Sequence, residues 1–243
     1  MDAFEIRRRD VVTLVGAGGK TTFMYVLAEE LAKESRKVIT TTTTKIWKPT
    51  KDDTEKLVVD PGGNIPADIF LNYSHVTCVT KITDEGKVVG VDPSKIHEWR
   101  TKYDIDCIIV EADGSKGKPF KAPASYEPII PPETTLYVVM VGVDAIDAPL
   151  NSNYVHRPEI IAKLSGASLG DNVTPAMIGT ILKYYLGMRP KLSRPIIFVN
   201  KVSTQTEIEK ATSIIRELKD EKTLALFGSI FKKRFWQVTK GNK

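Results

Sequence analysis

The sequence predicts an α/β protein built on a mostly parallel sheet with helices on both faces. Most of the expected strands are continuous apolar runs, as is typical of strands that are buried on both sides. These runs alternate along the chain with segments whose apolar residues recur every three or four positions, as in amphipathic helices. The 243 residues are 42% hydrophobic and 27% charged, a composition that indicates a folded core rather than disorder.

Each element has its own local signal. In the helix expected at 20–35, Phe23, Leu27 and Leu31 share one face. A proline near the start favours a helix at 93–103, and an Asp-Glu-Gly turn favours a hairpin at 81–91. The further helices are expected at 155–166, 174–187 and 204–219, and the strands at 10–16, 37–42, 56–59, 76–81, 106–114, 134–143, 195–200 and 223–230. We expect residues 1–243 to form a single domain with a small hairpin insertion around 76–91.

Composition and charge exclude several classes of protein. No apolar run approaches the roughly 18–20 residues that cross a bilayer, and the apolar stretch after the N-terminal arginines is too short for a signal peptide. We therefore expect a cytoplasmic protein that does not bind a membrane. The net charge is +5. Because much of it lies in the basic segment 231–236 and the tail 240–243, which we interpret as a solvated chain end, nucleic acid is not an expected partner.

Cysteine and histidine give no signal for a metal cluster. Cys78 and Cys107 lie in separate apolar runs and are expected to be buried, unreactive side chains. His75, His97 and His156 are far apart in the sequence, so their spacing does not suggest a shared ligand set.

A glycine-rich loop, VGAGGKTT at 15–22, joins the first expected strand to the first expected helix. Glycines let the backbone direct successive N–H groups at an anion, and the helix that follows adds its positive dipole end. In this interpretation Lys20 reaches the terminal phosphates and the Thr21 hydroxyl binds Mg²⁺. The loop is short, with Gly16 four residues before Lys20. It locally resembles the G-x-x-G-K-[ST] loop of the Mur ligase group of P-loop enzymes. The residues expected to bind nucleotide here are Gly16, Ala17, Gly18, Gly19, Lys20, Thr21 and Thr22.

Two carboxylates follow the strand expected at 106–114. Glu111 and Asp113 are two residues apart and project to the same side if the strand continues. A carboxylate at the end of a buried strand is costly unless a cation or a hydrogen-bond donor meets it, and Mg²⁺ on a triphosphate would supply the cation. One carboxylate holds Mg²⁺ through water and the other orients a nucleophile, with the assignment left open. Lys20, Glu111 and Asp113 are therefore the candidate catalytic residues. The metal candidates are Thr21, Glu111, Asp113 and Thr42, the last from a threonine run that also fits strand propensity alone.

The loop 113–125 carries lysines between glycines and prolines, and we expect it to become ordered when Mg²⁺ and a triphosphate bind. Lys116, Lys118 and Lys121 can meet phosphates or an acidic partner, although loop lysines are more often exposed to solvent.

The sequence leaves the choice of base open. FVNKVS at 198–203 places Asn200 and Lys201 as guanine-binding proteins do, but the acidic residue is replaced by Ser203. A neutral hydroxyl does not accept two charge-assisted hydrogen bonds from guanine. Thr204 and Glu207 also form a capping-box pattern for the next helix. The expected ligand is therefore ATP or GTP, with no guanine preference.

The motifs LVGAGGKTT, ITTTTTK, VEADGSKGKPFKAP, VGVDAI, VHRPE and FVNK, in this order, resemble the YqeC family along nearly the full length of the chain. The resemblance implies a P-loop NTPase fold. Members of that family are described as accessory proteins for selenium-dependent molybdenum hydroxylases. The resemblance also carries over Lys20, Thr21, Glu111, Asp113, Lys116, His156 and Arg157 as functional positions.

Three functions fit these expectations. The first is Mg²⁺-dependent binding and hydrolysis of a nucleoside triphosphate that serves maturation of a selenium-dependent molybdenum hydroxylase or its cofactor. Its partners would then be a molybdenum hydroxylase or a protein that handles the molybdenum or selenium cofactor. The second is a small-molecule kinase or Mur-like ligase. The third is a nucleotide-gated binding protein without significant turnover.

Overall fold

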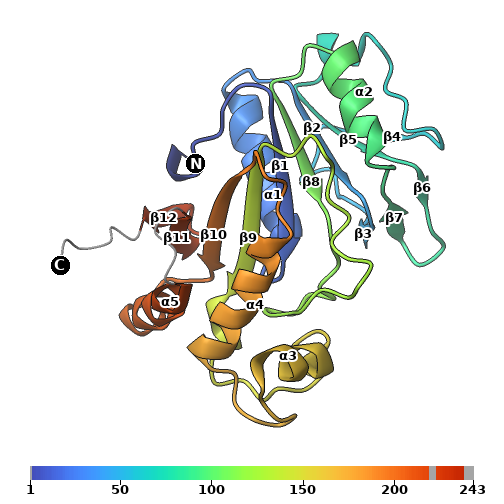
Figure 1. Ribbon diagram of the computed structural model, residues 1–243. Coiled ribbons are helices and arrows are strands. Elements are labelled where there is room, and N and C mark those ends of the chain that lie inside the picture. Colours follow the sequence, from blue (N-terminus) through green and yellow to red (C-terminus); the bar gives the residue numbers. More distant parts are fainter. Residues whose placement is uncertain (1, 219–222, 238–243) are drawn as a thin grey trace.

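The computed structural model describes residues 2–218 and 223–237, which form two sheets and five α-helices (Figure 1). The larger sheet has nine strands in the order β12 (Arg234–Gln237), β11 (Leu224–Ser229), β10 (Arg194–Asn200), β9 (Leu136–Gly142), β1 (Asp10–Gly16), β8 (Cys107–Glu111), β2 (Val38–Thr42), β5 (His75–Val79) and β4 (Lys56–Val59). The smaller sheet has the order β3 (Lys45–Trp47), β7 (Lys87–Val89) and β6 (Lys81–Ile82). All neighbours in the larger sheet are parallel except β11 and β12.

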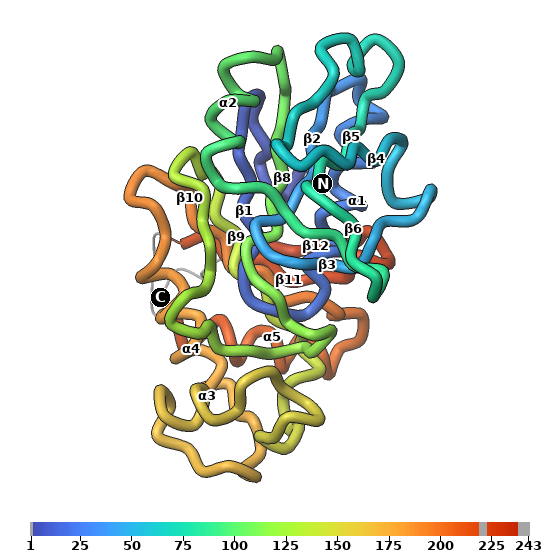
Figure 2. Tube along the Cα trace, turned by 90° about the vertical axis from the view of Figure 1, so that its right-hand side faces the viewer, coloured from blue at the N-terminus to red at the C-terminus, as the bar shows by residue number. Residues whose placement is uncertain are grey.

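The helices cover both faces of the larger sheet. They are α1 (Lys20–Lys33), α2 (Ser94–Lys102), α3 (Pro158–Ser165), α4 (Pro175–Gly187) and α5 (Gln205–Leu218), with short 3₁₀ helices η1 (Asp2–Phe4), η2 (Ile69–Leu71) and η3 (Val143–Ala145). Figure 2 shows α1 on one side of the strands and α2 and α4 on the other. The structure confirms the predicted mostly parallel α/β sheet with helices on both faces.

The core follows from the two-residue period of the strands. Even-numbered residues of β1, such as Val12 and Leu14, pack with α1, while Val15 packs with α4 and α5, and Val11 packs with α2. Burial of each large side chain of this kind stabilises the fold by roughly 1.5–3 kcal/mol. The first helix is therefore held against the sheet by the face that its sequence period predicts.

Strand order places the candidate site. β1 lies between β8 and β9, so the chain leaves β1 toward β2 on one side and later crosses to β9 on the other. Ligands of open α/β sheets bind beyond the carboxyl ends of the strands at such a reversal. In Figure 1 these ends point downward, and α3 lies beyond them.

Two strands escaped the sequence prediction. The segment 231–236 was expected to be a solvated chain end, but Arg234–Gln237 form β12, which pairs antiparallel with β11. The Phe235 ring lies 5.4 Å from that of Phe4 and 5.8 Å from that of Phe198, so aromatic packing holds this edge strand. The tail 240–243 lies outside the described residues. The second missed strand, β3, pairs with the expected hairpin of β6 and β7 and makes it a three-stranded sheet.

Two other local predictions, the burial of the cysteines and the capping box of α5, are confirmed. Cys78 and Cys107 are buried. The capping box of α5 forms, because the Glu207 carboxylate accepts from the Thr204 backbone N–H and the Thr204 hydroxyl accepts from the Glu207 N–H. None of the helices in the described parts of the chain is long and apolar enough to cross a membrane.

Candidate nucleotide site at the glycine loop

The loop between β1 and α1 has a backbone that only glycine adopts easily. Gly16, Gly18 and Gly19 have φ angles of 90°, 84° and 112°. A Cβ on Gly16 would lie 2.3 Å from the Met140 carbonyl oxygen, and one on Gly18 would lie 2.2 Å from the Gly142 nitrogen. The glycines therefore serve both the left-handed conformation and close packing against the end of β9.

The loop leads directly into the N-terminus of α1. Gly19 is the N-cap residue, and no side chain in the described structure caps the helix there. The first amides of α1, including those of Thr21 and Thr22, have no acceptor within the helix. Together with the positive end of the helix dipole, they form an anion-binding end. Earlier loop amides are already bonded: Ala17 N–H donates to Met140 and Gly18 N–H donates to the Lys118 carbonyl.

Lys20 lies inside the loop rather than in solvent, with 2% of its surface exposed. Its Nζ donates to the Gly16 carbonyl oxygen at 2.6 Å. The same Nζ lies 3.6 Å from Glu111 Oε1 and 3.3 Å from Asp113 Oδ1. The two carboxylates predicted from the end of β8 thus face one buried ammonium group.

Glu111 is the carboxylate nearest to the start of α1. Its Oε2 accepts a hydrogen bond of 2.7 Å from the Thr21 hydroxyl. Burial raises the pKa of Glu111, and Asp113 raises it further, while Lys20 and the Thr21 hydroxyl oppose the shift. The Thr42 hydroxyl donates to the backbone carbonyl of Glu111 at 2.7 Å, so Thr42 holds the strand end and does not present a free hydroxyl.

Asp113 is fully buried and its two oxygens are surrounded by protein donors. Both accept from the Gly16 backbone N–H, at 3.1 and 3.2 Å. Lys121 Nζ lies 2.9 Å from Oδ2, and the Tyr185 hydroxyl donates to Oδ2 at 2.8 Å. Burial and then Asp113 raise the pKa of Tyr185 well above its usual value, so the tyrosine remains a donor.

A buried chain of charges extends away from Asp113. Lys121 also bonds Glu127 at 2.7 Å, and Arg157 binds both oxygens of Glu127, at 2.5 and 3.1 Å. Burial alone would raise the pKa of Glu127, but the hydrogen bonds from Arg157 and Lys121 outweigh it and hold the pKa at about 2. Lys121 is 1% exposed, so the expectation that it is an exposed loop lysine is wrong.

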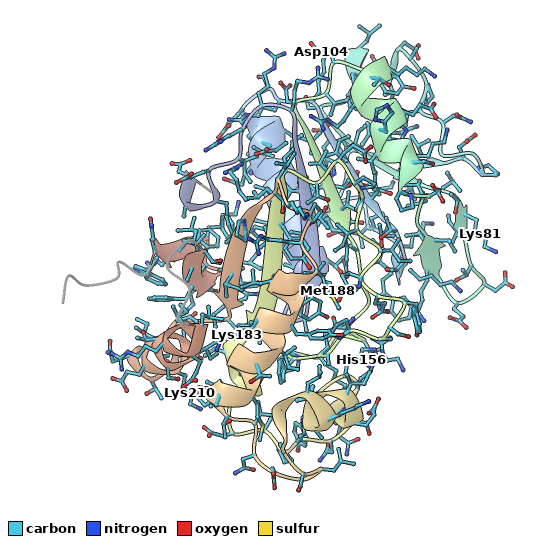
Figure 3. The ribbon with its side chains drawn as sticks, viewed as in Figure 1. Lys81, Asp104, His156, Lys183, Met188 and Lys210 are labelled. Carbon is cyan, nitrogen blue, oxygen red and sulfur yellow. The ribbon has the colours of Figure 1, made fainter. Side chains whose placement is uncertain are left out.

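The other loop residues lie farther from α1. His156 pairs through its backbone with Phe120 and lies close to α3 (Figure 3). Burial, and then the charge of Arg157, lower the pKa of His156 to about 4, so it is neutral at pH 7. Lys116 is exposed, and Lys118 Nζ donates to the Asn153 carbonyl. The chain of charges therefore connects Arg157 to the glycine loop, whereas His156 is joined to residues 120–122 by backbone hydrogen bonds.

The residues predicted for base recognition lie on the β10 side of the loop. Asn200 Nδ2 donates to the Gly18 carbonyl at 2.7 Å, and its Oδ1 accepts from the Ile230 N–H. Lys201 Nζ pairs with Asp144 at 2.6 Å. Asn200 thus holds the loop in place, and Lys201 lies at its exposed rim.

Two members of the charge network, Glu127 and Tyr185, escaped the sequence prediction as site residues, and Lys121 was predicted only as a loop lysine that can meet phosphates or an acidic partner. Lys121 and Glu127 follow Asp113 in a loop where charged residues alternate with prolines. Such a segment has no helix or strand periodicity, so the sequence does not show which of its side chains are buried. Tyr185 lies in an apolar helix segment. Across residues 2–218 and 223–237, no group of three or more histidine, cysteine or acidic residues is arranged to hold a metal ion by itself.

The fold and the glycine loop define the class of protein: an α/β protein of the P-loop NTPase-like type. The model of the YqeC protein family matches residues 12–159. The uncharacterized protein YqeC of Escherichia coli (strain K12) is 30% identical over 200 residues, which cover 81% of this chain and 78% of the relative. The chain belongs to the YqeC family.

Two solved structures are similar at a lower level. The hydrogenase maturation factor HypB from Archaeoglobus fulgidus is 12% identical with a TM-score of 0.45, covering 96% of this chain and 87% of its own. FtsY from Mycoplasma mycoides is 12% identical with a TM-score of 0.41, covering 93% of this chain and 66% of its own. Similarity at this level carries no inference about activity.

Proposed function

We propose that this protein binds a nucleoside triphosphate with Mg²⁺ at the glycine loop and hydrolyses it. The observation that carries the proposal is the grouping of Lys20, the Thr21 hydroxyl and Glu111 at the uncapped N-terminus of α1. Backbone amides and a lysine supply donors to phosphate, and a hydroxyl with a nearby carboxylate is the donor set that Mg²⁺ uses beside phosphates.

Each residue has a role that follows from its contacts. Lys20 balances charge on the terminal phosphates. Thr21 would hold Mg²⁺ through its hydroxyl, and Glu111 would support the metal from beside it, because its carboxylate already lies 2.7 Å from that hydroxyl. When bound, Mg²⁺ supplies positive charge beside the developing negative charge of the phosphates.

Asp113 receives a different role in this proposal. Its oxygens are taken by the Gly16 amide, Lys20, Lys121 and Tyr185, so it positions the loop and the lysine instead of binding the metal. Thr42 likewise positions Glu111 through the backbone bond described above. The loop that carries Lys116 and Lys118 acts as the nucleotide-sensitive segment. Its link to the glycine loop is the hydrogen bond that the Lys118 carbonyl accepts from the Gly18 amide.

The wider role that we propose is maturation of a selenium-dependent molybdenum hydroxylase or its cofactor, in the cytoplasm. Family membership motivates this part of the proposal. The partner would be that hydroxylase or a protein that handles the molybdenum or selenium cofactor, and the nucleotide ATP or GTP.

A second candidate is a small-molecule kinase or Mur-like ligase. It is favoured by a pocket of about 180 Å³ that opens beside Thr21 and Thr22 and is large enough for a small second substrate. Product that forms only when such a substrate is added would distinguish this activity from hydrolysis alone. Tight nucleotide binding without phosphate release would instead indicate a nucleotide-gated binding protein.

The test is the Lys20→Ala variant. We expect its affinity for the triphosphate with Mg²⁺, measured by calorimetry, to fall by at least about thirtyfold, since a charge-assisted contact is lost. Lys33→Ala, on the exposed far end of α1, is the matched control and should bind as the parent does. Circular dichroism checks that both variants are folded. Equal affinity in Lys20→Ala and the parent would refute the phosphate-loop proposal.

A further inference from the structure

The pocket beside the first turn of α1 has two walls from different parts of the chain. One wall consists of Thr21, Thr22 and Tyr25, and the other includes Trp47 and the acidic pair at 52–53. Its volume is about 180 Å³, below the roughly 300–1,000 Å³ of pockets that hold drug-sized ligands. The pocket is therefore matched to a single small ring system or to one end of a larger molecule.

A buried tyrosine lines this pocket without a satisfied hydroxyl. Tyr25 is 6% exposed, and its hydroxyl makes no hydrogen bond of normal geometry with any described residue, although the Thr77 side chain lies near enough for a weak contact. Burial raises its pKa far above the usual value, and the nearby Asp53 and Glu111 add to this effect, so the group stays protonated. Buried hydroxyl groups in folded proteins are nearly always paired, so an unpaired one beside a pocket points to a ligand partner.

The opposite wall combines an aromatic ring with carboxylates. Trp47 is 67% exposed, with the Lys87 ammonium 5.2 Å from its ring centroid. Asp53 uses Oδ2 to accept from the Thr50 amide and hydroxyl, both at 2.8 Å, and Oδ1 has no partner among the described residues. An exposed indole provides a surface for stacking, and a free carboxylate oxygen accepts from N–H donors.

The pocket lies on the side of the glycine loop away from the base-recognition residues. Asn200 ends β10, which is two strands from β1 in one direction, while Trp47 ends β3, which follows β2 on the other side of β1. A nucleotide whose base lies toward Asn200 therefore leaves this pocket free. Thr21 and Thr22 connect the pocket to the end of α1 where the phosphates are expected.

We propose that the pocket binds a second substrate, a small planar heterocycle that carries N–H donors, beside the terminal phosphate. The ring stacks on Trp47, its N–H groups donate to Asp53, and the Tyr25 hydroxyl bonds its ring nitrogen or carbonyl. This inference rests on the proposed nucleotide binding and names the class of molecule on which that nucleotide site acts.

The test is calorimetry with two ring compounds on the protein saturated with Mg²⁺ and a non-hydrolysable triphosphate. The probe 2-aminobenzimidazole carries N–H donors, and 1-methylbenzimidazole has similar shape and none. We expect the parent to bind 2-aminobenzimidazole at least about tenfold more tightly, because the carboxylate contact is charge-assisted. Asp53→Asn should remove about tenfold of affinity, and Trp47→Ala about fivefold. Trp236→Ala, a second partly exposed tryptophan outside the pocket, should not change it.

Tyr25→Phe separates binding from folding. It should weaken binding of 2-aminobenzimidazole by about fivefold with little change in the melting temperature, because only the weak contact with Thr77 is lost. Equal binding of both compounds, or equal binding by Tyr25→Phe, Trp47→Ala and the parent, would overturn the proposal. No binding of either ring by a parent that binds the triphosphate would also overturn it, while leaving the nucleotide proposal intact. Failure of the triphosphate itself to bind would instead defeat the proposed function.

Discussion

The two flanks of the glycine loop differ in how far their polar groups are satisfied. On one flank Asp113, Lys121, Glu127 and Arg157 form a continuous buried chain in which each charge meets an opposite one. On the other flank, around Tyr25 and the pocket, the buried Tyr25 hydroxyl makes no hydrogen bond of normal geometry in the described structure and has only a weak contact with Thr77. The charged groups of the first flank are all paired within the protein without any ligand, whereas the second flank keeps a polar group without a hydrogen bond of normal geometry.

This difference separates structural residues from binding residues. Breaking a buried, paired charge leaves its partner desolvated and is costly to stability. Removing an unpaired group costs little in the free protein and affects only what binds to it. Lys20 lies between the two flanks, since it contacts Asp113 on one side and Glu111 beside Thr21 on the other.

The largest expected effect is on stability when the complete flank is broken. Asp113→Asn keeps the side-chain volume but leaves Lys20 and Lys121 without their shared carboxylate. We expect the free energy of unfolding, measured in urea, to fall by about 3–5 kcal/mol. The control Asp144→Asn breaks the exposed pair with Lys201 and should cost less than about 1 kcal/mol. Equal losses in the two variants would show that the buried chain does not hold the loop.

A smaller effect should appear as pH dependence on the flank that carries the pocket. Burial lowers the pKa of His75 from 6.5 to about 4, and its ring packs 6.3 Å from that of Tyr25. Between these two pH values the unfolded chain binds a proton that the folded chain excludes. Stability is therefore lost as pH falls from 6.5 to about 4, by roughly 2–3 kcal/mol for His75.

His75→Gln separates this contribution from others. His156 also has its pKa lowered, to about 4, and adds to the acid loss in the parent. Urea unfolding of His75→Gln at several pH values should show a shallower decline than the parent, with the part due to His156 remaining. An unchanged slope in the variant would mean that His75 is protonated in the folded state without cost.

The smallest expected effect concerns the nucleotide base. The Glu207 carboxylate is occupied by the amides of Ser203 and Thr204, and Asp144 is paired with Lys201, so neither is a free acid for guanine. We expect ATP and GTP to compete within about tenfold of each other, compared with the 10⁴–10⁵ that a lost buried polar partner can impose. Competition calorimetry measures this ratio, and a strong preference for GTP would show that another acid is recruited.

Much of the fold was predictable because the signals are local. The apolar run 10–16 matches β1 residue for residue, and the period of three to four residues placed α1 within two residues of its end. β12 was missed because its packing partners, Phe4 and Phe198, are distant in the sequence. A short basic segment has no periodicity that reveals such contacts.

The candidate site was predictable in part for the same reason. Lys20 and Thr21 follow from one contiguous motif, and Glu111 and Asp113 from one strand end. The different surroundings of the two carboxylates were not predictable, since Tyr185 and Lys121 reach Asp113 from a distant helix and from a loop. The pocket was not predicted from the sequence, because Trp47 and Tyr25 line the same pocket only through the arrangement of β3 and α1.

The most direct test of the distinction between the flanks is the Mg²⁺ concentration at which Glu111→Gln reaches half-maximal triphosphate binding. Glu111 is buried but accepts from the hydroxyl of Thr21, which lines the pocket, so its loss should weaken the metal contact. We predict that the Mg²⁺ midpoint rises by about tenfold or more, as when an outer-shell ligand is removed. Glu34→Gln, just past the end of α1, should leave the midpoint at the parent value. An unchanged midpoint in a folded Glu111→Gln variant would contradict the assignment of Glu111 to the metal.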